Sequence, residues 1–347
     1  MAHVHCVVQN YDSLLTQTSI PLSTQLLVAS MLLAASHYSD RAWKQNTMDR
    51  TRAILEHSSD RDLLTAEAHR QSVLLRTSGK FEESSRGLRD YIESTVFREH
   101  DKGTTMDPRW NALCGNLQIS LAENLIQVNE LAHATEEINR WEPLSSSSPT
   151  TIERVVLCSR SVVLGRILRF QGCFDEALPH FESLLEEADM IDYFETSGSH
   201  KKIITNIADL HCEMNNGLKA EKVITPILKR MTDWGCENIS SGQRIQLSLA
   251  ESFLRRGMHA KAGKIFESVN LACEPTGKPN AATNISIFRS RAGLARIAHL
   301  ENDWNEAVRR WREALNVVED CGWHDGFIAC ISQLSLAHIY KELDDAE

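Results

Sequence analysis

Residues 118–122 read QISLA, and the same five-residue pattern returns as QLSLA at residues 246–250 and again at residues 333–337. The copies are offset by 128 and 87 residues, which are close to three times and twice a period of about 43 residues. A pattern that recurs with one such period is typical of proteins built from stacked structural repeats. The sequence therefore predicts a repeat protein.

The repeat can be aligned on a small residue that is expected to open the second of two helices. Around this anchor another small residue lies twelve positions earlier, Gly or Asn lies five positions earlier, and a large apolar residue lies four positions later. The anchors are Ser84, Ala134, Ala177, Ala220, Ala262 and Ala307. The earlier small residues are Ser72, Ala122, Gly165, Ala208, Ala250 and Ala295. The Gly and Asn residues are Gly79, Asn129, Gly172, Asn215, Gly257 and Asn302, and the large residues are Leu88, Ile138, Phe181, Ile224, Phe266 and Trp311.

This pattern predicts that each repeat is a pair of helices joined by a short turn. Gly and Asn tolerate a left-handed backbone, so they can end the first helix. The small residues let the two helices cross closely, and the large apolar residue fills the space between repeats. One helix pair cannot bury its apolar stripe alone, so the repeats must stack.

The alignment of the repeats also predicts which residues of the three QISLA-like copies point inward and which lie at the surface. Their last two residues, Leu121–Ala122, Leu249–Ala250 and Leu336–Ala337, are expected to form an inward stripe. Ile119, Leu247 and Leu334 are expected to lie at the rim of a groove.

The pattern resembles the tetratricopeptide repeat family over roughly residues 60–345. The positions that carry the resemblance are Leu164, Gly165, Gly172, Phe174, Ala177 and Phe181, together with Trp304, Ala307 and Ala314. The family's basic repeat has 34 residues, whereas this one is longer, as in kinesin light chains and the sensor arms of NLR-type receptors. The resemblance implies an all-α fold, a right-handed α-solenoid of stacked helix-turn-helix repeats, whose first helices line a concave, protein-binding groove.

We expect four segments along the chain: an N-terminal tail at 1–19, a capping helix pair at 20–58, about six repeats at 59–318 and a C-terminal capping helix at 319–347. The final QLSLA copy begins a repeat that has no second helix. Either this helix closes the array, or the array continues into a second chain or a longer protein. A homo-oligomer formed through the terminal helices is one such possibility.

The composition excludes several classes of function. The chain has 347 residues, and its formal net charge of −10 argues against binding to nucleic acid. The most apolar run, Gln25–Ser36, is shorter than the roughly 20 residues that a membrane span needs. Nine scattered cysteines without a C-x-x-C pair indicate reduced thiols, and so a cytoplasmic or nuclear location.

No nucleotide-binding, zinc-protease or serine-hydrolase motif occurs in the sequence. His3, His5 and Cys6 could contribute to a metal site, but no distant fourth ligand is evident, so no metal and no cofactor is predicted. The sequence favours a protein that is not an enzyme, without deciding the question, and identifies no catalytic residue.

Basic residues recur at the positions that would face the groove. They are Arg76, Arg166, Arg169, Lys202, Arg244, Arg255, Arg289 and Arg296, with His299 beside them, and Glu123, Asp209, Glu213 and Glu251 are interleaved among them. Arginine pairs bidentately with carboxylates and phosphates, so these residues could bind an acidic ligand. The alternative is that they form salt bridges with the interleaved acids.

Three functions remain open at this point. The first is an interaction scaffold whose Arg-containing groove binds an acidic peptide or helix of a partner protein. The second is a small-molecule-binding protein or unusual enzyme with a pocket inside the superhelix, walled by His299, Phe170 and Trp304. The third, a subunit of a proteasome-lid-like assembly, is disfavoured because no strand-rich module follows the helices.

Overall fold

A computed structural model describes residues 21–35, 41–56, 58–97, 107–189, 198–273, 281–321 and 327–344. The chain divides into two compact bodies. Body 1 comprises Met1–Leu125 and Glu136–Val156, and body 2 comprises Ile126–Thr135 and Leu157–Glu347. The His3, His5 and Cys6 cluster and the predicted tail lie outside the described residues.

Body 1 contains α2 (Leu22–Ala35), α3 (Arg41–Leu55), α4 (Arg61–Arg76), α5 (Phe81–Tyr91), the π-helix η2 (Ile92–Phe97) and most of α7 (Pro108–Gln127). The body boundaries cut through α7, α8 (Leu131–Asn139) and α9 (Thr151–Phe170). The apolar faces of α2, α3 and α4 form one core. The residues of this core are Ala29, Leu33, Met48, Leu55, Leu63 and Leu74.

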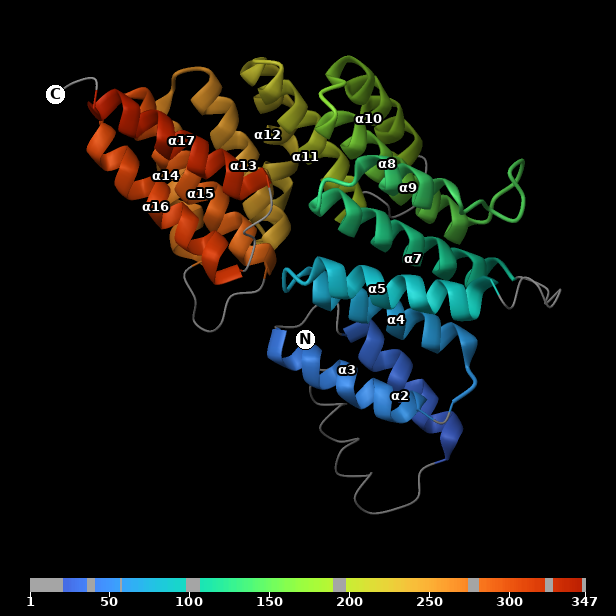
Figure 1. Cartoon of the computed structure of the whole chain (residues 1–347). Coiled ribbons are helices and arrows are strands. Elements are labelled where there is room, and N and C mark those ends of the chain that lie inside the picture. Colours follow the sequence, from blue (N-terminus) through green and yellow to red (C-terminus); the bar gives the residue numbers. More distant parts are fainter. Residues whose placement is uncertain are drawn as a thin grey trace. The chain divides into compact units, whose positions relative to one another are not determined.

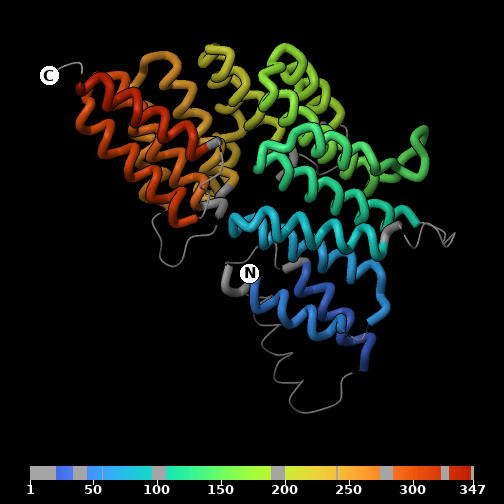
Figure 2. Tube along the Cα trace, viewed as in Figure 1, coloured from blue at the N-terminus to red at the C-terminus, as the bar shows by residue number. Residues whose placement is uncertain are grey.

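Body 2 is a stack of helix pairs in chain order (Figure 1). After α9 it contains α10 (Phe174–Asp189), α11 (Gly198–Glu213), α12 (Gly217–Asp233), α13 (Ser240–Arg255), α14 (His259–Cys273), α15 (Ala281–Leu300), α16 (Trp304–Cys321) and α17 (Phe327–Asp344). Each helix packs against the next, and α13 also packs against α11 and α15 (Figure 2). None of the described residues lies in a strand, so the predicted all-α repeat architecture is confirmed.

The predicted turns are confirmed at the level of the backbone. Asn129, Asn215 and Asn302 have φ of 62°, 59° and 59°, and the corresponding glycines Gly79, Gly172 and Gly257 have φ of 77°, 79° and 68°. Each helix pair therefore reverses at a residue in the left-handed region, where Gly and Asn are favoured over other residues.

The predicted close packing is also confirmed. All six anchors are buried, and so are the six large apolar residues, of which Phe181 and Ile224 are 0% exposed. A Cβ built on Gly165 would lie 2.6 Å from Cζ of Phe181. Glycine is thus required there because the ring of the paired helix occupies the space of a side chain.

The face assignments of the QISLA-like copies were partly wrong. Leu247, expected at a rim, is 1% exposed, because α13 packs between α11 and α15. Ala337, expected to be covered like the fully buried Ala122 and Ala250, is exposed. Of the expected inward pair on α17, only Leu336 is therefore buried.

The Ser-rich connector before α9 is anchored by one buried carboxylate. Glu153 is 1% exposed and accepts hydrogen bonds from the backbone N–H of Leu144 and Thr150, the hydroxyl of Thr150 and the amide of Asn111, at 2.8–3.0 Å. Burial alone would raise the pKa of Glu153, but these hydrogen bonds outweigh burial and lower it from 4.5 to about 2.

Glu153→Gln is expected to lower the free energy of unfolding of body 1 by about 1–3 kcal/mol at neutral pH, because charge-assisted hydrogen bonds are lost. The folded pKa lies below the unfolded one, so the stabilisation is complete above pH 4.5 and disappears as the pH falls towards 2. Denaturation of both variants across this range measures the difference. A difference that stayed constant with pH would contradict the assignment.

No helix in the described part of the chain is both long and apolar enough to cross a lipid bilayer.

Candidate functional site

The first helices of the pairs in body 2 carry an excess of positive charge. From Leu157 onward, α9, α11, α13 and α15 contain ten Lys or Arg and three Asp or Glu. The basic residues are Arg160, Arg166, Arg169, Lys201, Lys202, Arg244, Arg255, Arg289, Arg291 and Arg296, and the acids are Asp209, Glu213 and Glu251. We call the surface formed by the predicted groove residues of these four helices the first-helix face.

The second helices have the opposite balance. Together α10, α12, α14 and α16 contain nine Lys or Arg and thirteen Asp or Glu. Over these residues the first helices of body 2 therefore carry a net positive charge and the second helices a net negative one, in a chain whose net charge is −10. The first-helix layer is thus the more electropositive of the two.

Asp209 on α11 is the centre of the first charged cluster of this face. Its carboxylate lies 3.3 Å from Nη1 of Arg169 and 3.4 Å from Nη2 of Arg289, and it accepts a 2.6 Å hydrogen bond from Ser248. Burial would raise the pKa of Asp209, but Arg289, Arg169 and the Ser248 hydroxyl hold it below its ordinary value. Arg289 on α15 reaches Asp209 past α13, so this contact ties together helices on either side of α13.

Arg169 is the more buried of the two arginines that bind Asp209. It also donates to Glu213 through Nε and Nη2, at 2.8 and 2.6 Å, and to Asn206 at 3.1 Å. Its side chain is 17% exposed. These contacts leave Arg169 a structural cation with little capacity for a ligand.

Glu251 on α13 is the centre of the second cluster. It accepts two hydrogen bonds from Arg296 of α15, at 2.7 and 3.0 Å, and one from Nε of Arg255 at 2.9 Å. Burial would raise the pKa of Glu251, but Arg296 and Arg255 lower it, so the carboxylate stays ionised. The side chains of Arg255 and Arg296 remain 37% and 34% exposed.

The other predicted basic residues, except Arg76, lie on the same helices. Arg166 is half-buried on α9, with its guanidinium 5.9 Å from the ring of Phe170. Lys202 on α11 and Arg244 on α13 are exposed. Arg76 belongs to body 1, where it pairs with Glu123 at 2.7 Å. Several of the predicted arginines thus bind the interleaved acids, as the salt-bridge alternative expects, whereas Lys202 and Arg244 are exposed.

His299 lies near the C-terminal end of α15, between two other rings. Its ring stacks on His338 of α17 at 5.1 Å between centroids and meets Trp304 edge-on at 5.5 Å. Burial and the neighbouring His338 lower the pKa of His299 below its ordinary value of 6.5, and Glu342 partly opposes them. His299 is therefore neutral at pH 7.

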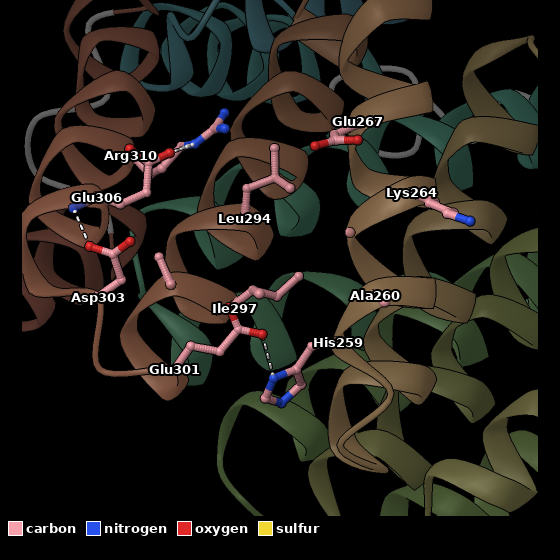
Figure 3. A pocket seen from close by; sticks show the side chains of 12 residues that line it. His259, Ala260, Lys264, Glu267, Leu294, Ile297, Glu301, Asp303, Glu306 and Arg310 are labelled. Carbon is pink, nitrogen blue, oxygen red and sulfur yellow. Dashed lines mark hydrogen bonds and ion pairs between the residues drawn. The ribbon is translucent and has the colours of Figure 1, made fainter.

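Among the described residues of body 2, two pockets are lined by charged side chains. The first, of about 340 Å³, lies among α14, α15 and α16 (Figure 3). His259 binds Glu301 there at 3.1 Å, and Glu306 holds Arg310 at 2.8 Å. Four carboxylates line it, and two of its three basic residues, His259 and Arg310, are paired with two of them, so it offers little to an anion.

The second pocket, of about 370 Å³, opens beside the Glu251 cluster. It is lined by Asn215, Leu254, Arg255, Arg296, His299 and Leu300. Three of these are predicted site residues, whereas Phe170 and Trp304, expected as walls of a pocket, do not line it. Sequence reasoning identified Asn215 only as a turn residue, and nothing in the pattern marked Leu254 or Leu300 as lining. Among the described residues no group of three or more His, Cys, Asp or Glu could hold a metal ion.

No family model matches the sequence, and no curated protein matches it either. Several solved structures match, and two of them are similar in fold over most of this chain. A Rap protein complexed with Competence and Sporulation Factor aligns with a TM-score of 0.60 at 12% identity, over 93% of this chain and 87% of that one. The other is a signal transduction ATPase with numerous domains from Pyrococcus horikoshii, which has a tetratricopeptide repeat sensor. It aligns with a TM-score of 0.55 at 13% identity, over 91% of this chain but only 44% of its own length. The chain is therefore similar in fold to tetratricopeptide-like helical repeat proteins.

Proposed function

We propose that this protein is an interaction scaffold whose first-helix face binds an acidic segment of a partner protein. The observation that carries the proposal is the segregation of charge in body 2. The first helices contain ten basic and three acidic residues, whereas acidic residues outnumber basic ones on the second helices. The proposal also includes that the repeats belong to the long variety of tetratricopeptide-like repeats.

The geometry of the Asp209 cluster supports a face that curves inward. Neighbouring packed helices lie about 8–10 Å apart, so α11 and α15 would be about 16–20 Å apart in a flat layer. Contact between Asp209 and Arg289 across α13 is easier if the layer is concave. Helical repeats commonly bind a partner segment on an extended concave surface. The Rap protein of similar fold is complexed with Competence and Sporulation Factor.

The buried and exposed cations have different parts in this proposal. Arg169, Arg289 and Arg296 hold the four first helices together through Asp209 and Glu251. Exposed Lys202 and Arg244 are the cations that an acidic segment would meet first. Reversing their charge should therefore impair binding without removing the ion pairs of Asp209 and Glu251.

A selection from a random-peptide display library tests the proposal. We expect peptides selected on the natural protein to be enriched in Asp and Glu, and we expect the enrichment to be lost with the double variant Lys202→Glu, Arg244→Glu. The control is Lys222→Glu, Lys229→Glu, which makes the same change of charge at exposed positions of α12. Circular dichroism verifies that each variant is folded.

Two results would overturn the proposed function. One is the absence of acidic enrichment on the natural protein. The other is an enrichment that survives the Lys202 and Arg244 reversals, or that is lost equally in the α12 control. The first result would exclude an acidic segment as the ligand, and the second would exclude the first-helix face as its binding surface.

A further inference from the structure

The pocket beside the Glu251 cluster is lined by hydrogen-bond donors and by no carboxylate. Arg255 donates to Glu251 only through Nε, so its two Nη groups have no hydrogen-bond partner among the described residues. The Nε of Arg296 is also without a partner there, since both of its bonds to Glu251 come from Nη1 and Nη2. The side chain of Asn215 adds an amide.

We propose that this pocket binds a carboxylate attached to an apolar residue, with the Nη groups of Arg255 as its direct partners. The proposal rests on the proposed function in that the pocket lies on the first-helix face. It names the chemistry of one ligand group at a defined place.

Charge at the pocket favours a carboxylate over a phosphoryl group. Arg255 and Arg296 together exceed Glu251 by one positive charge, which matches a monoanion. A dianion would bring a second negative charge close to the ionised Glu251. The pair of parallel N–H groups at the end of a guanidinium also matches the two oxygens of a carboxylate.

The two leucines explain why an apolar group should accompany the carboxylate. Leu300 is 56% exposed at the edge of the pocket, and Leu254, 4% exposed, belongs to its wall. An apolar side chain placed against Leu300 would bury surface that water now contacts. The volume of about 370 Å³ is within the range of small ligand sites.

Glu251 positions Arg255 rather than competing for the ligand. Its carboxylate holds Nε of Arg255 at 2.9 Å and is itself held by both Nη groups of Arg296. The end of the Arg255 guanidinium is therefore oriented before a ligand arrives, which lowers the entropic cost of binding.

The pocket should also bind its ligand more tightly as the pH falls below neutral. His299 lines it together with Arg255 on α13 and Arg296 on α15, and its other neighbours are Trp304 on α16 and His338 and Glu342 on α17. Protonation of His299 adds a positive charge to the pocket, and a bound carboxylate favours this protonation. By linkage, ligand binding must raise the pKa of His299.

The experiment is a titration of the full chain with N-acetyl-leucine and with N-acetyl-leucinamide, followed by NMR. We expect the acid to bind at least about tenfold more tightly than the amide, since the amide lacks the charge that Arg255 pairs with. Equal binding of acid and amide, or binding of neither, would overturn the proposal. The His299 ring signals should shift to a higher pKa with the acid alone.

Arg255→Gln should abolish the preference for the acid. The matched control is Arg256→Gln, because Arg256 is the next residue but pairs with Glu221 of α12. Acid binding that persists in Arg255→Gln would refute the assignment. Arg255 is exposed, and circular dichroism verifies that the variant folds as the natural protein does.

Two sources could supply the carboxylate, and a third ligand separates them. A peptide that ends in a free leucine will bind more tightly than N-acetyl-leucine if the natural ligand is the end of a chain. It will bind equally or more weakly if the natural ligand is a small carboxylic acid. The peptide selection tests the whole face and N-acetyl-leucine tests the pocket alone, so either proposal can fail while the other stands.

Discussion

Asp209→Ala is expected to lower the local stability of body 2 by about 3–5 kcal/mol, because it removes the buried carboxylate that Arg169 and Arg289 share and leaves Arg169 only Glu213 as a counter-charge among the described residues. Asp209 is 8% exposed, and Arg169, Arg289 and Ser248 all direct donors at it. Hydrogen exchange of the α11 and α13 amides measures the loss, and it does so even when a repeat array does not unfold in one step.

Two further variants separate a charge effect from simple loss of packing. Glu213→Ala removes a more exposed acid that binds the same Arg169, and it should cost about 0–1 kcal/mol. Asp209→Leu combined with Arg169→Met replaces the buried pair by apolar residues and should recover much of the loss. A double variant as unstable as Asp209→Ala would contradict the electrostatic explanation.

Phe181→Ala is expected to lower the free energy of unfolding of body 2 by about 3–5 kcal/mol, the usual cost of removing a fully buried aromatic ring. Phe181 is 0% exposed and belongs to a core made by α9, α10 and α11, together with Val162, Leu184 and Ile207. Chemical denaturation followed by circular dichroism measures the effect. A loss under about 1 kcal/mol would mean that the three helices close over the cavity.

The ring of Phe181 also allows a test in which an atom is added beside it, at Gly165, instead of a side chain being removed. Gly165→Ala should destabilise by about 1–3 kcal/mol, because its Cβ would lie 2.6 Å from the Phe181 ring. In a Phe181→Leu background the cost should be smaller. Gly263→Ala on α14 is the control, since its Cβ would meet only Ile297, at 3.6 Å. That change should stabilise the helix by about 0.5–1 kcal/mol.

The turns and the helix pairs were predictable because short segments determine them. Asn215 and Gly257 end first helices because their own backbones tolerate a positive φ. The period then placed Ala208 and Phe181 in buried positions, since a fixed spacing on a helix fixes the face. The same reasoning placed the basic residues of α9, α11, α13 and α15 on one layer of helices.

The partners of those basic residues were not predictable, because they come from other repeats. Arg289 binds an aspartate 80 positions earlier in the chain, and Arg296 binds a glutamate 45 positions earlier. Such contacts depend on how neighbouring first helices cross, which the spacing within one repeat does not specify. For the same reason the sequence did not identify Leu254 and Leu300 as pocket residues.

The sequence by itself thus determined the repeat, its turns, its buried positions and the helices that carry positive charge, since local backbone preference and helical periodicity are enough to specify these features. Only the tertiary structure decided that Asp209 and Glu251 neutralise part of that charge and that the ends of Arg255 remain open to a ligand. It also decided that Ala337, identical in sequence context to the buried Ala250, is exposed. The physical reason is that burial and ion pairing depend on which neighbouring helix is present, and no pattern within a single helix records its neighbour.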